Sequence, residues 1–242
     1  MANSSNIALH MYVQNAPANG LARIYRLIAS IGEEQSITHP QNKVVALQLA
    51  TSIYLVQFVL AMEDKRFWMH PGIDPFGIGR AIIMRFLGRG SRQGGSTIPE
   101  QVLKLRAGNT QIKEISERIM RAGSGLRLNF HESKADILAD YFQRIYLGGS
   151  CYGVMSAAQK YFKCSPSDLT PAQSFFISER IGSPNVWRYG RLKNIISRMV
   201  IRRLLGQDLI YLPVIYGKFF GHRAEVGFNK IISQTTDVSD SG

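Results

Sequence analysis

The residues best suited to acid–base chemistry lie in the stretch AMEDKRFWMHPGIDPFGIGR, residues 61–80. Glu63 and Asp64 are adjacent carboxylates that end a long uncharged run, where an acidic pair is costly unless it is paired or used. His70 and a Pro–Gly turn follow within the same span. We therefore predict that Glu63 is a catalytic base and that the rest of the chain builds its substrate groove.

A second candidate site is the sequence QGGST at residues 93–97, which precedes an apolar stretch. Glycines let the backbone approach a ligand closely, and a helix start offers unpaired N–H groups, so this loop could bind a pyrophosphate or a sugar. Thr97 and Glu100 also fit a capping box, so Glu100 either caps the helix or contacts substrate. Lys104 lies about one turn further on and faces either the same site or solvent.

The composition indicates a globular protein with an anionic partner. The 242 residues allow one large domain or two small ones. Lys and Arg total 29 against 17 Asp and Glu, a net charge of +12, which favours nucleic acid, an anionic membrane or a phosphorylated substrate. Basic residues without interleaved aromatic residues are weak support for nucleic acid, which we do not expect as a partner. Cys151 and Cys164 are expected to be buried thiols.

Helical periodicity dominates the chain, and strand-like alternation is scarce. Helices are expected over residues 43–62, 75–87, 113–128, 133–147, 153–162, 171–181 and 191–205, with a further helix starting near Thr97. The polar tail after Gly221 is expected to be partly disordered.

Two apolar segments raise the question of membrane contact. Residues 44–62 form an uncharged run of 19 residues, nearly the length of a membrane span. The run contains Gln48 and Gln57 and leads directly into Glu63, so a buried helix that delivers Glu63 to a cleft is favoured over a transmembrane helix. Residues 209–216 (LIYLPVIY) are either a buried strand or helix or a peripheral membrane contact. No secretory signal is visible at the N-terminus.

Several motifs in order resemble those of glycosyltransferase family 51, the peptidoglycan glycosyltransferases of class A penicillin-binding proteins and their monofunctional relatives. The stretch EDKRFWMHPGID is similar to the first motif, and QGGSTIPEQVLKL, about thirty residues on, to the second. The stretch SKADILADYFQRIYLGGSCYGVMSAAQKYFKCSPSDLTPAQ resembles the helix pair after the catalytic region, and RLKNIISRM resembles the fifth motif. The resemblance covers about residues 44 to 205 and marks the chain as a divergent member.

This resemblance implies a mainly α fold, with a lysozyme-like large lobe and a small membrane-facing jaw lobe. It divides the chain into an N-terminal extension (1–42), a glycosyltransferase domain (43–205) and a partly disordered C-terminal extension (206–242). It implies an enzyme that polymerises lipid II into glycan strands by inverting transfer, with release of undecaprenyl pyrophosphate. Glu63 would be the general base that takes the proton from the acceptor's sugar hydroxyl.

The resemblance also implies partners and a location. The partners would be lipid II, the nascent glycan strand, an anionic membrane surface and cell-wall synthesis proteins. No cofactor is expected to be required, and either Lys and Arg or a divalent cation (Mg or Mn) would neutralise the pyrophosphate. The protein would be membrane-associated on the periplasmic or extracytoplasmic side, either peripherally or through an N-terminal anchor that is missing here.

The resemblance assigns substrate contacts to residues of three motifs. Phe67 and His70 could instead pack the jaw lobe and hold Glu63 in place. The substrate-binding residues that it implies are Asp64, Phe67, His70, Gln93, Gly95, Ser96, Thr97, Gln101, Lys104 and Arg198.

The second catalytic carboxylate is where the sequence departs most from the family. The third motif usually reads Arg-Lys-x-x-Glu, and an ungapped alignment places its Arg on Glu117 and its Glu on Arg121, four residues apart on one helix face. A gapped alignment places the second carboxylate on Glu117 or Glu114, and Glu117 is our prediction. The sequence leaves two functions open: a polymerising enzyme with reduced activity, or a degenerate homologue that binds lipid II or glycan without polymerising it.

Overall fold

Apolar residues at helical spacing give a mainly helical structure, as the sequence predicts. The computed structural model describes residues 51–77, 79, 96–108 and 115–236, with side chains described except at residues 115–122 and 235–236. Across these ranges the regular elements are helices, together with an isolated antiparallel bridge between Tyr146 and Tyr152. The prediction of a mainly α fold is therefore confirmed.

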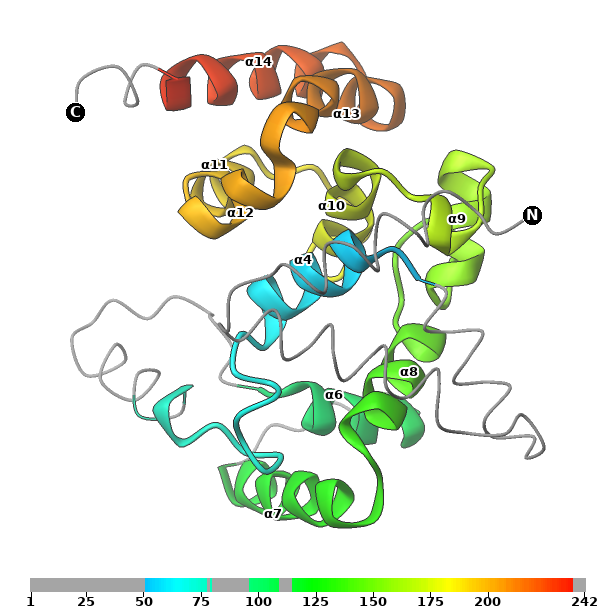
Figure 1. Cartoon of the computed structure of the whole chain (residues 1–242), viewed down its shortest axis with the longest axis vertical. Coiled ribbons are helices and arrows are strands. Elements are labelled where there is room, and N and C mark those ends of the chain that lie inside the picture. Colours follow the sequence, from blue (N-terminus) through cyan, green and yellow to red (C-terminus); the bar gives the residue numbers. More distant parts are fainter. Residues whose placement is uncertain (1–50, 78, 80–95, 109–114, 237–242) are drawn as a thin grey trace, which may run out of the picture. The chain divides into compact units, whose positions relative to one another are not determined.

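From residue 115 on, the helices follow one another through short connections (Figure 1). In chain order they are α4 (Ile53–Glu63), α6 (Ile98–Arg106), α7 (Ile115–His131), α8 (Lys134–Arg144), α9 (Val154–Phe162), the 3₁₀ turn η1 (Pro166–Asp168), α10 (Pro171–Arg180), α11 (Tyr189–Ile196), α12 (Met199–Leu205), the 3₁₀ turn η2 (Gly206–Tyr211), α13 (Leu212–Phe220) and α14 (His222–Thr236).

Capping side chains set the helix starts that the sequence predicts. Thr97 accepts a hydrogen bond from the backbone N–H of Glu100 at the start of α6, and Ser133 caps α8 in the same way. At α10 Thr170 and Gln173 form a full capping box, in which each side chain accepts from the other residue's backbone N–H. These starts agree with the predicted ones within a residue.

The helix that ends at Glu63 lies in the core. Leu55 and Phe58 are fully buried in α4, which packs against α10 and α12. Phe58 meets Phe175 of α10 edge to face, with ring centroids 5.5 Å apart. Within the described residues no helix is long and apolar enough to span a bilayer. The prediction of a buried helix is confirmed for residues 53–63, whereas residues 44–50 lie outside the described ranges.

The predicted helix 191–205 is two helices. Arg198 adopts an extended backbone between α11 and α12, so the chain changes direction there. As a result Met199 is 67% exposed whereas Ile201 is fully buried. A single helix would have placed Met199 on the buried face with Leu192 and Ile195, so the phase of the apolar pattern shifts at the break.

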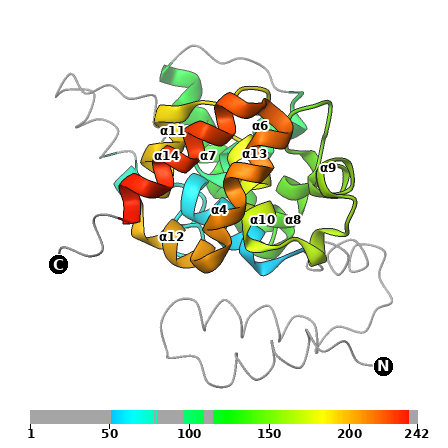
Figure 2. The same ribbon diagram turned by 90° about the horizontal axis from the view of Figure 1, so that it is seen from above.

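The expectation of a disordered tail after Gly221 is wrong for residues 222–236, which form α14. Ala224, Phe228 and Ile231 of this helix are buried, and their spacing of four and three residues is that of one helix face. The helix lies beside α13 and also contacts α11 (Figure 2). Tyr216 of α13 meets Phe228 with ring centroids 4.3 Å apart. The polar residues between these positions hid the apolar stripe.

Residues 209–216 form the end of η2 and the first half of α13. Leu212 and Tyr216 are buried, whereas Ile210, Tyr211 and Val214 are more than half exposed. The segment is thus helical and partly buried, with an apolar outer face. Most of the predicted helix 75–87 and residues 93–95 of the QGGST stretch lie outside the described residues. The predicted division of the chain at residues 42 and 205 stays a prediction.

Candidate active site at the end of α4

Glu63 is the last residue of α4, where a carboxylate meets an unfavourable environment. The helix end carries partial negative charge, and the side chain is only partly exposed. Burial raises the pKa of Glu63, and Asp64 adds to that rise, whereas the charges of Arg191 and Arg198 and a hydrogen bond from Gln101 oppose it. A carboxylate with a raised pKa is a stronger proton acceptor, which suits a general base that works near neutral pH.

Two polar side chains, Gln101 and Tyr141, form a chain of hydrogen bonds that ends at the Glu63 carboxylate. The Tyr141 hydroxyl donates to Oε1 of Gln101 over 2.9 Å, and Nε2 of Gln101 then faces Oε2 of Glu63 at 3.5 Å. Burial raises the pKa of Tyr141, and the charges of Glu63 and Asp64 raise it further, so the hydroxyl keeps its proton and remains a donor. Gln101, predicted as a site residue, therefore lies beside the predicted base.

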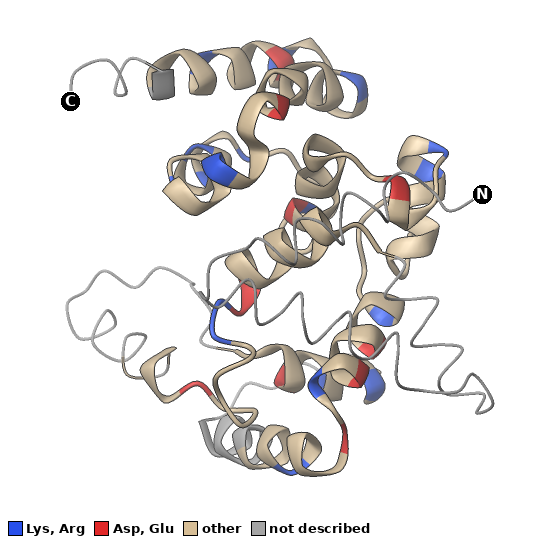
Figure 3. Ribbon diagram, in the orientation of Figure 1, with Lys and Arg blue, Asp and Glu red and all other residues tan. Residues whose placement is uncertain are grey.

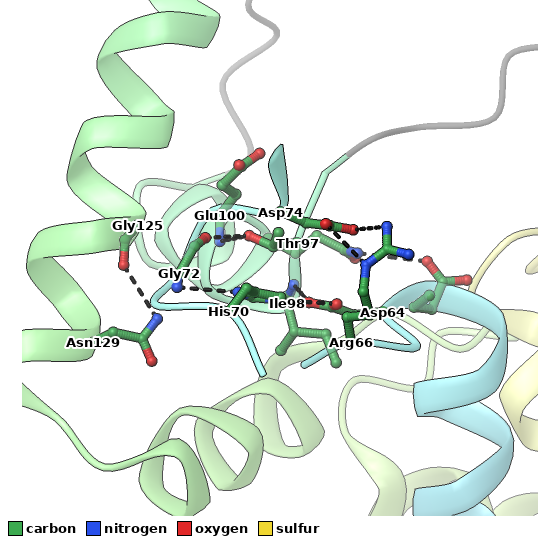
Figure 4. A network of polar contacts seen from close by, with 12 residues as sticks. Asp64, Arg66, His70, Gly72, Asp74, Thr97, Ile98, Glu100, Gly125 and Asn129 are labelled. Atoms are coloured by element: carbon green, nitrogen blue, oxygen red, sulfur yellow. Dashed lines mark hydrogen bonds and ion pairs between the residues drawn. The ribbon is translucent and has the colours of Figure 1, made fainter. Parts of the chain in front are cut away.

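Asp64 is occupied by internal hydrogen bonds (Figure 4). Its oxygens lie 3.0 and 2.9 Å from Nε2 of His70, and the backbone N–H of Ile98 donates to Oδ2 over 2.9 Å. Nδ1 of His70 accepts from the backbone N–H of Gly72 over 3.0 Å, so Nε2 carries the imidazole proton and donates it to Asp64. Asp64 and His70 thus join the turn after α4 to the start of α6.

The Thr97 hydroxyl ties the same turn to α6. It donates to the carbonyl oxygen of Gly72 over 2.7 Å and accepts the Glu100 N–H (Figure 4). Gly72 has a φ of 110°, which favours glycine, and a Cβ there would overlap the carbonyl oxygen of Gly125 in α7. The turn therefore needs glycine both for its backbone conformation and for its contact with α7.

The predicted site residues divide into those that surround Glu63 and those that support it. Gln101 lies beside Glu63. The charge of the exposed Arg198 opposes the rise in the pKa of Glu63. Asp64, Phe67, His70 and Thr97 are buried. Asp64, His70 and Thr97 form hydrogen bonds with one another or with nearby backbone groups. The predicted contacts of this set with substrate stay predictions.

The remaining predicted residues are less informative. Ser96 is exposed and Lys104 is partly buried. Glu117 belongs to α7, but its side chain lies outside the described ones, and Gln93 and Gly95 lie outside the described residues altogether.

Sequence reasoning did not single out Arg191 as a site residue. Its charge is the largest influence that opposes the raised pKa of Glu63. Arg191 and Arg198 bound the RLKNIISR stretch at a spacing of seven residues, and that spacing places two side chains on one side of a helix. The spacing could have indicated that Arg191 and Arg198 act at one site, although the helix is interrupted between α11 and α12.

Lys134 is a second residue that sequence reasoning missed. Its Nζ is buried, has no hydrogen-bond partner among the described residues, and lies 4.5 Å from the ring centroid of Phe67. Burial lowers the pKa of Lys134 to about 8, and the charge of Asp64 opposes that shift. A lysine in the first turn of a helix is unfavourable beside the helix dipole, and that feature could have marked it.

We expect Lys134→Met to be more stable than the wild type at pH 7, by a margin that shrinks at higher pH. Below pH 8 the buried ammonium penalises only the folded state. Between about 8 and the ordinary value of 10.5 the folded protein releases the proton first, so wild-type stability gains with rising pH. Thermal unfolding of both proteins from pH 7 to pH 10 measures this margin. Lys230→Met, at an exposed lysine, is the control, and a margin that does not vary with pH contradicts the prediction.

Comparison with known proteins places these helices in a family context. A family model described as Transglycosylase matches residues 29–204. Penicillin-binding protein 1A of Haemophilus influenzae is 34% identical over 195 residues, which cover 76% of this chain and 22% of that protein. Penicillin-binding proteins 1A of Rickettsia conorii (35% over 179 residues; 68% and 22%) and Streptococcus oralis (29% over 188 residues; 72% and 28%) are similar as well. The chain spans less than a third of the length of these relatives.

Proposed function

The chain belongs to the transglycosylase family, and from that membership we propose that it is a peptidoglycan glycosyltransferase that polymerises lipid II into glycan strands. The observation that carries this proposal is Glu63 itself. It is a partly exposed carboxylate at the end of a buried helix, its pKa is raised by burial, and two arginine charges act on it. This is the environment that a general base beside an anionic leaving group requires.

In the proposed reaction Glu63 takes the proton from the attacking hydroxyl of the acceptor sugar. The hydroxyl oxygen forms a bond to the anomeric carbon of the donor as the bond from that carbon to the pyrophosphate oxygen breaks. Attack from the opposite face inverts the anomeric configuration, and undecaprenyl pyrophosphate leaves with the bonding electrons. Gln101 holds the Glu63 carboxylate in place through the contact at 3.5 Å.

Positive charge near Glu63 supports the departure of the pyrophosphate. Arg191 and Arg198 act on Glu63 from α11 and the start of α12, and this part of the chain is rich in basic residues (Figure 3). Among the described residues no group of three or more His, Cys, Asp or Glu side chains could hold a metal ion. We assign the charge that neutralises the pyrophosphate to arginine and to Lys104, with a divalent cation (Mg or Mn) as the alternative.

The second carboxylate of the reaction is proposed to come from α7. Glu117 and Arg121 both belong to this helix, one turn apart. If Glu117 is the second carboxylate, Glu117→Ala abolishes polymerisation and Arg121→Glu gives no gain. If the carboxylate has been lost to Arg121, Arg121→Glu raises the rate of polymerisation instead. Measuring glycan product from both variants beside the wild type decides between these assignments, and loss of product in Glu114→Ala alone would move the role to Glu114.

A second candidate function is binding of lipid II or glycan strands without polymerisation. The sequence departures in the third motif favour it. So does Gln173, because the fourth motif of the family that the chain resembles usually reads Thr-x-x-Glu, and Gln173 stands at the position of that Glu. The Gln173 side chain accepts a hydrogen bond from the Thr170 N–H over 3.0 Å, a capping role that requires no carboxylate. In this case the protein would keep the surface that binds lipid II or glycan but would not polymerise lipid II.

We propose that the protein acts at an anionic membrane surface, with cell-wall synthesis proteins as further partners. Exposed apolar residues lie close in sequence to basic ones in α12, η2 and α13, a combination that suits the headgroup region of a bilayer. The exposed apolar residues are Met199, Val200, Ile210, Tyr211 and Val214, and the basic ones include Arg198, Arg203 and Lys218. The periplasmic or extracytoplasmic location is part of this proposal.

Incubation of the detergent-solubilised protein with labelled lipid II tests the two functions together. Glycan polymer from the wild type supports the enzyme. Saturable binding of lipid II without polymer, under conditions in which a known polymerase is active, supports the binding protein and rejects the enzyme. Neither binding nor polymer rejects both.

A further inference from the structure

The end of α10 holds two adjacent charged residues that are both fully buried. Glu179 and Arg180 have no exposed surface, and the Arg180 guanidinium donates to Oε2 of Glu179. The Tyr216 hydroxyl donates to the same oxygen over 3.2 Å, and Arg180 lies over the ring of Phe220 at 4.6 Å. A buried ion pair contributes little net stability, because desolvation offsets the attraction. Its presence therefore calls for a role beyond stabilising the fold.

The second carboxylate oxygen of Glu179 points to that role. Within the described residues Oε1 of Glu179 has no hydrogen-bond partner, and Nε of Arg191 lies 3.4 Å from it as an ion pair. Burial raises the pKa of Glu179, whereas the charges of Arg180 and Arg191 oppose the rise. One carboxylate thus holds two guanidinium groups, that of the fully buried Arg180 and that of the partly exposed Arg191.

Gly182 supplies the space that Arg191 needs. A Cβ at Gly182 would overlap the guanidinium of Arg191, with Nη2 and Cζ as its nearest atoms. The backbone of Gly182 does not lie in the left-handed region that favours glycine. The absence of a side chain there therefore serves the position of Arg191 and not the conformation of the chain.

We propose that Glu179 and Gly182 are positioning residues that hold the Arg191 guanidinium in the orientation from which it serves the proposed active site. The inference rests on the proposed function for its meaning in catalysis, but the positioning itself is a property of the folded protein. Without Glu179, two guanidinium groups would face each other unshielded and Arg191 would move away. With a side chain at residue 182, Arg191 would be displaced directly.

Several other groups act on Glu63, and they must stay constant for the effect to be assigned to Arg191. Asp64 follows Glu63 in the chain, Gln101 and Tyr141 reach it from α6 and α8, and Arg198 acts from the start of α12. Substitution at Gly182 changes none of these residues, and Gly182 is exposed, so the variant is expected to fold.

The test is the pKa of Glu63 in the 242-residue chain, measured from the side-chain carboxyl carbon by NMR titration. We expect Gly182→Ala to raise this pKa, because an attractive positive charge has moved away. Gly190→Ala is the matched control, since a Cβ at Gly190 meets nothing within 4 Å, and it should leave the pKa unchanged. Arg191→Gln should raise the pKa as Gly182→Ala does, and the double variant should raise it no further.

Glu179→Gln should shift the pKa in the same direction, and if it fails to fold, Gly182→Ala decides alone. An unchanged Glu63 pKa in Gly182→Ala, or a further shift in the double variant, overturns the proposal. In the polymerisation assay the acid limb of the pH–rate profile should move upward by the same amount as the pKa. If the pKa shifts but the wild type makes no polymer, the positioning stands and the proposed function fails.

Discussion

Glu63→Gln is expected to lower the rate of lipid II polymerisation by roughly 10²–10⁴-fold, the usual contribution of a positioned general base. The amide keeps the size of the side chain but cannot accept the proton of the acceptor hydroxyl. Binding of lipid II should change much less, because Gln101 and the arginines remain in place. Initial rates of polymer formation and the affinity for lipid II, measured on the same preparations, separate the two effects.

The stability of the same variant provides an independent check. Because burial raises the pKa of Glu63, ionisation of this group penalises the folded state as the pH rises above its ordinary value of 4.5. Glu63→Gln should therefore unfold at a higher temperature than the wild type at pH 7, and at nearly the same temperature at pH 4. A variant that loses activity and also loses stability at pH 7 would indicate misfolding and contradict this assignment. Glu225→Gln on α14, away from the site, is the control for both measurements.

Asp64→Ala is expected to destabilise the protein by about 3–4 kcal/mol, because it leaves two buried donors unsatisfied. These donors are Nε2–H of His70 and the backbone N–H of Ile98, which lie 2.9–3.0 Å from the carboxylate. For a protein of this size the corresponding fall in melting temperature is roughly 6–16 °C. Thermal unfolding followed by circular dichroism at pH 7 measures it.

Asp168→Ala removes an exposed carboxylate and is the matched control, with an expected change within about 0.5 kcal/mol. Asp64→Ala should also weaken polymerisation, since the start of α6 carries Gln101 to the base. A melting temperature near that of the wild type, together with full loss of lipid II binding, would assign Asp64 to substrate binding and reject the supporting role.

The features that sequence reasoning could predict are those encoded by neighbouring residues. The caps at Thr97, Ser133 and Thr170 fix helix starts locally, and the uncharged run before Glu63 marks a buried helix with a carboxylate at its end. Two motifs of one family predicted Glu63 and Gln101 as site residues, and the structure brings these two side chains together.

The features that it could not predict depend on contacts between distant residues. The position of Lys134 in the first turn of a helix marks it as unusual but does not show that its ammonium is buried against Phe67. Nothing near Glu179 and Arg180 indicates that both are fully enclosed. The enclosure of Glu179 and Arg180 depends on α13, whose Tyr216 contacts Glu179 from more than thirty residues later in the chain. The tail was judged by its polar composition, whereas its three buried residues decide its structure.

The aromatic rings of α13 also bear on where the folding unit ends. The family match stops at residue 204, but Tyr216, Phe219 and Phe220 cover Phe176 and Arg180 at the end of α10. A fragment that ends at residue 204 would expose the ion pair of Glu179 and Arg180 to water. It would also lack the aromatic rings that pack on Phe176. The shortest portion that can be expressed with its interior intact therefore includes α13, together with the α14 face that packs on Tyr216.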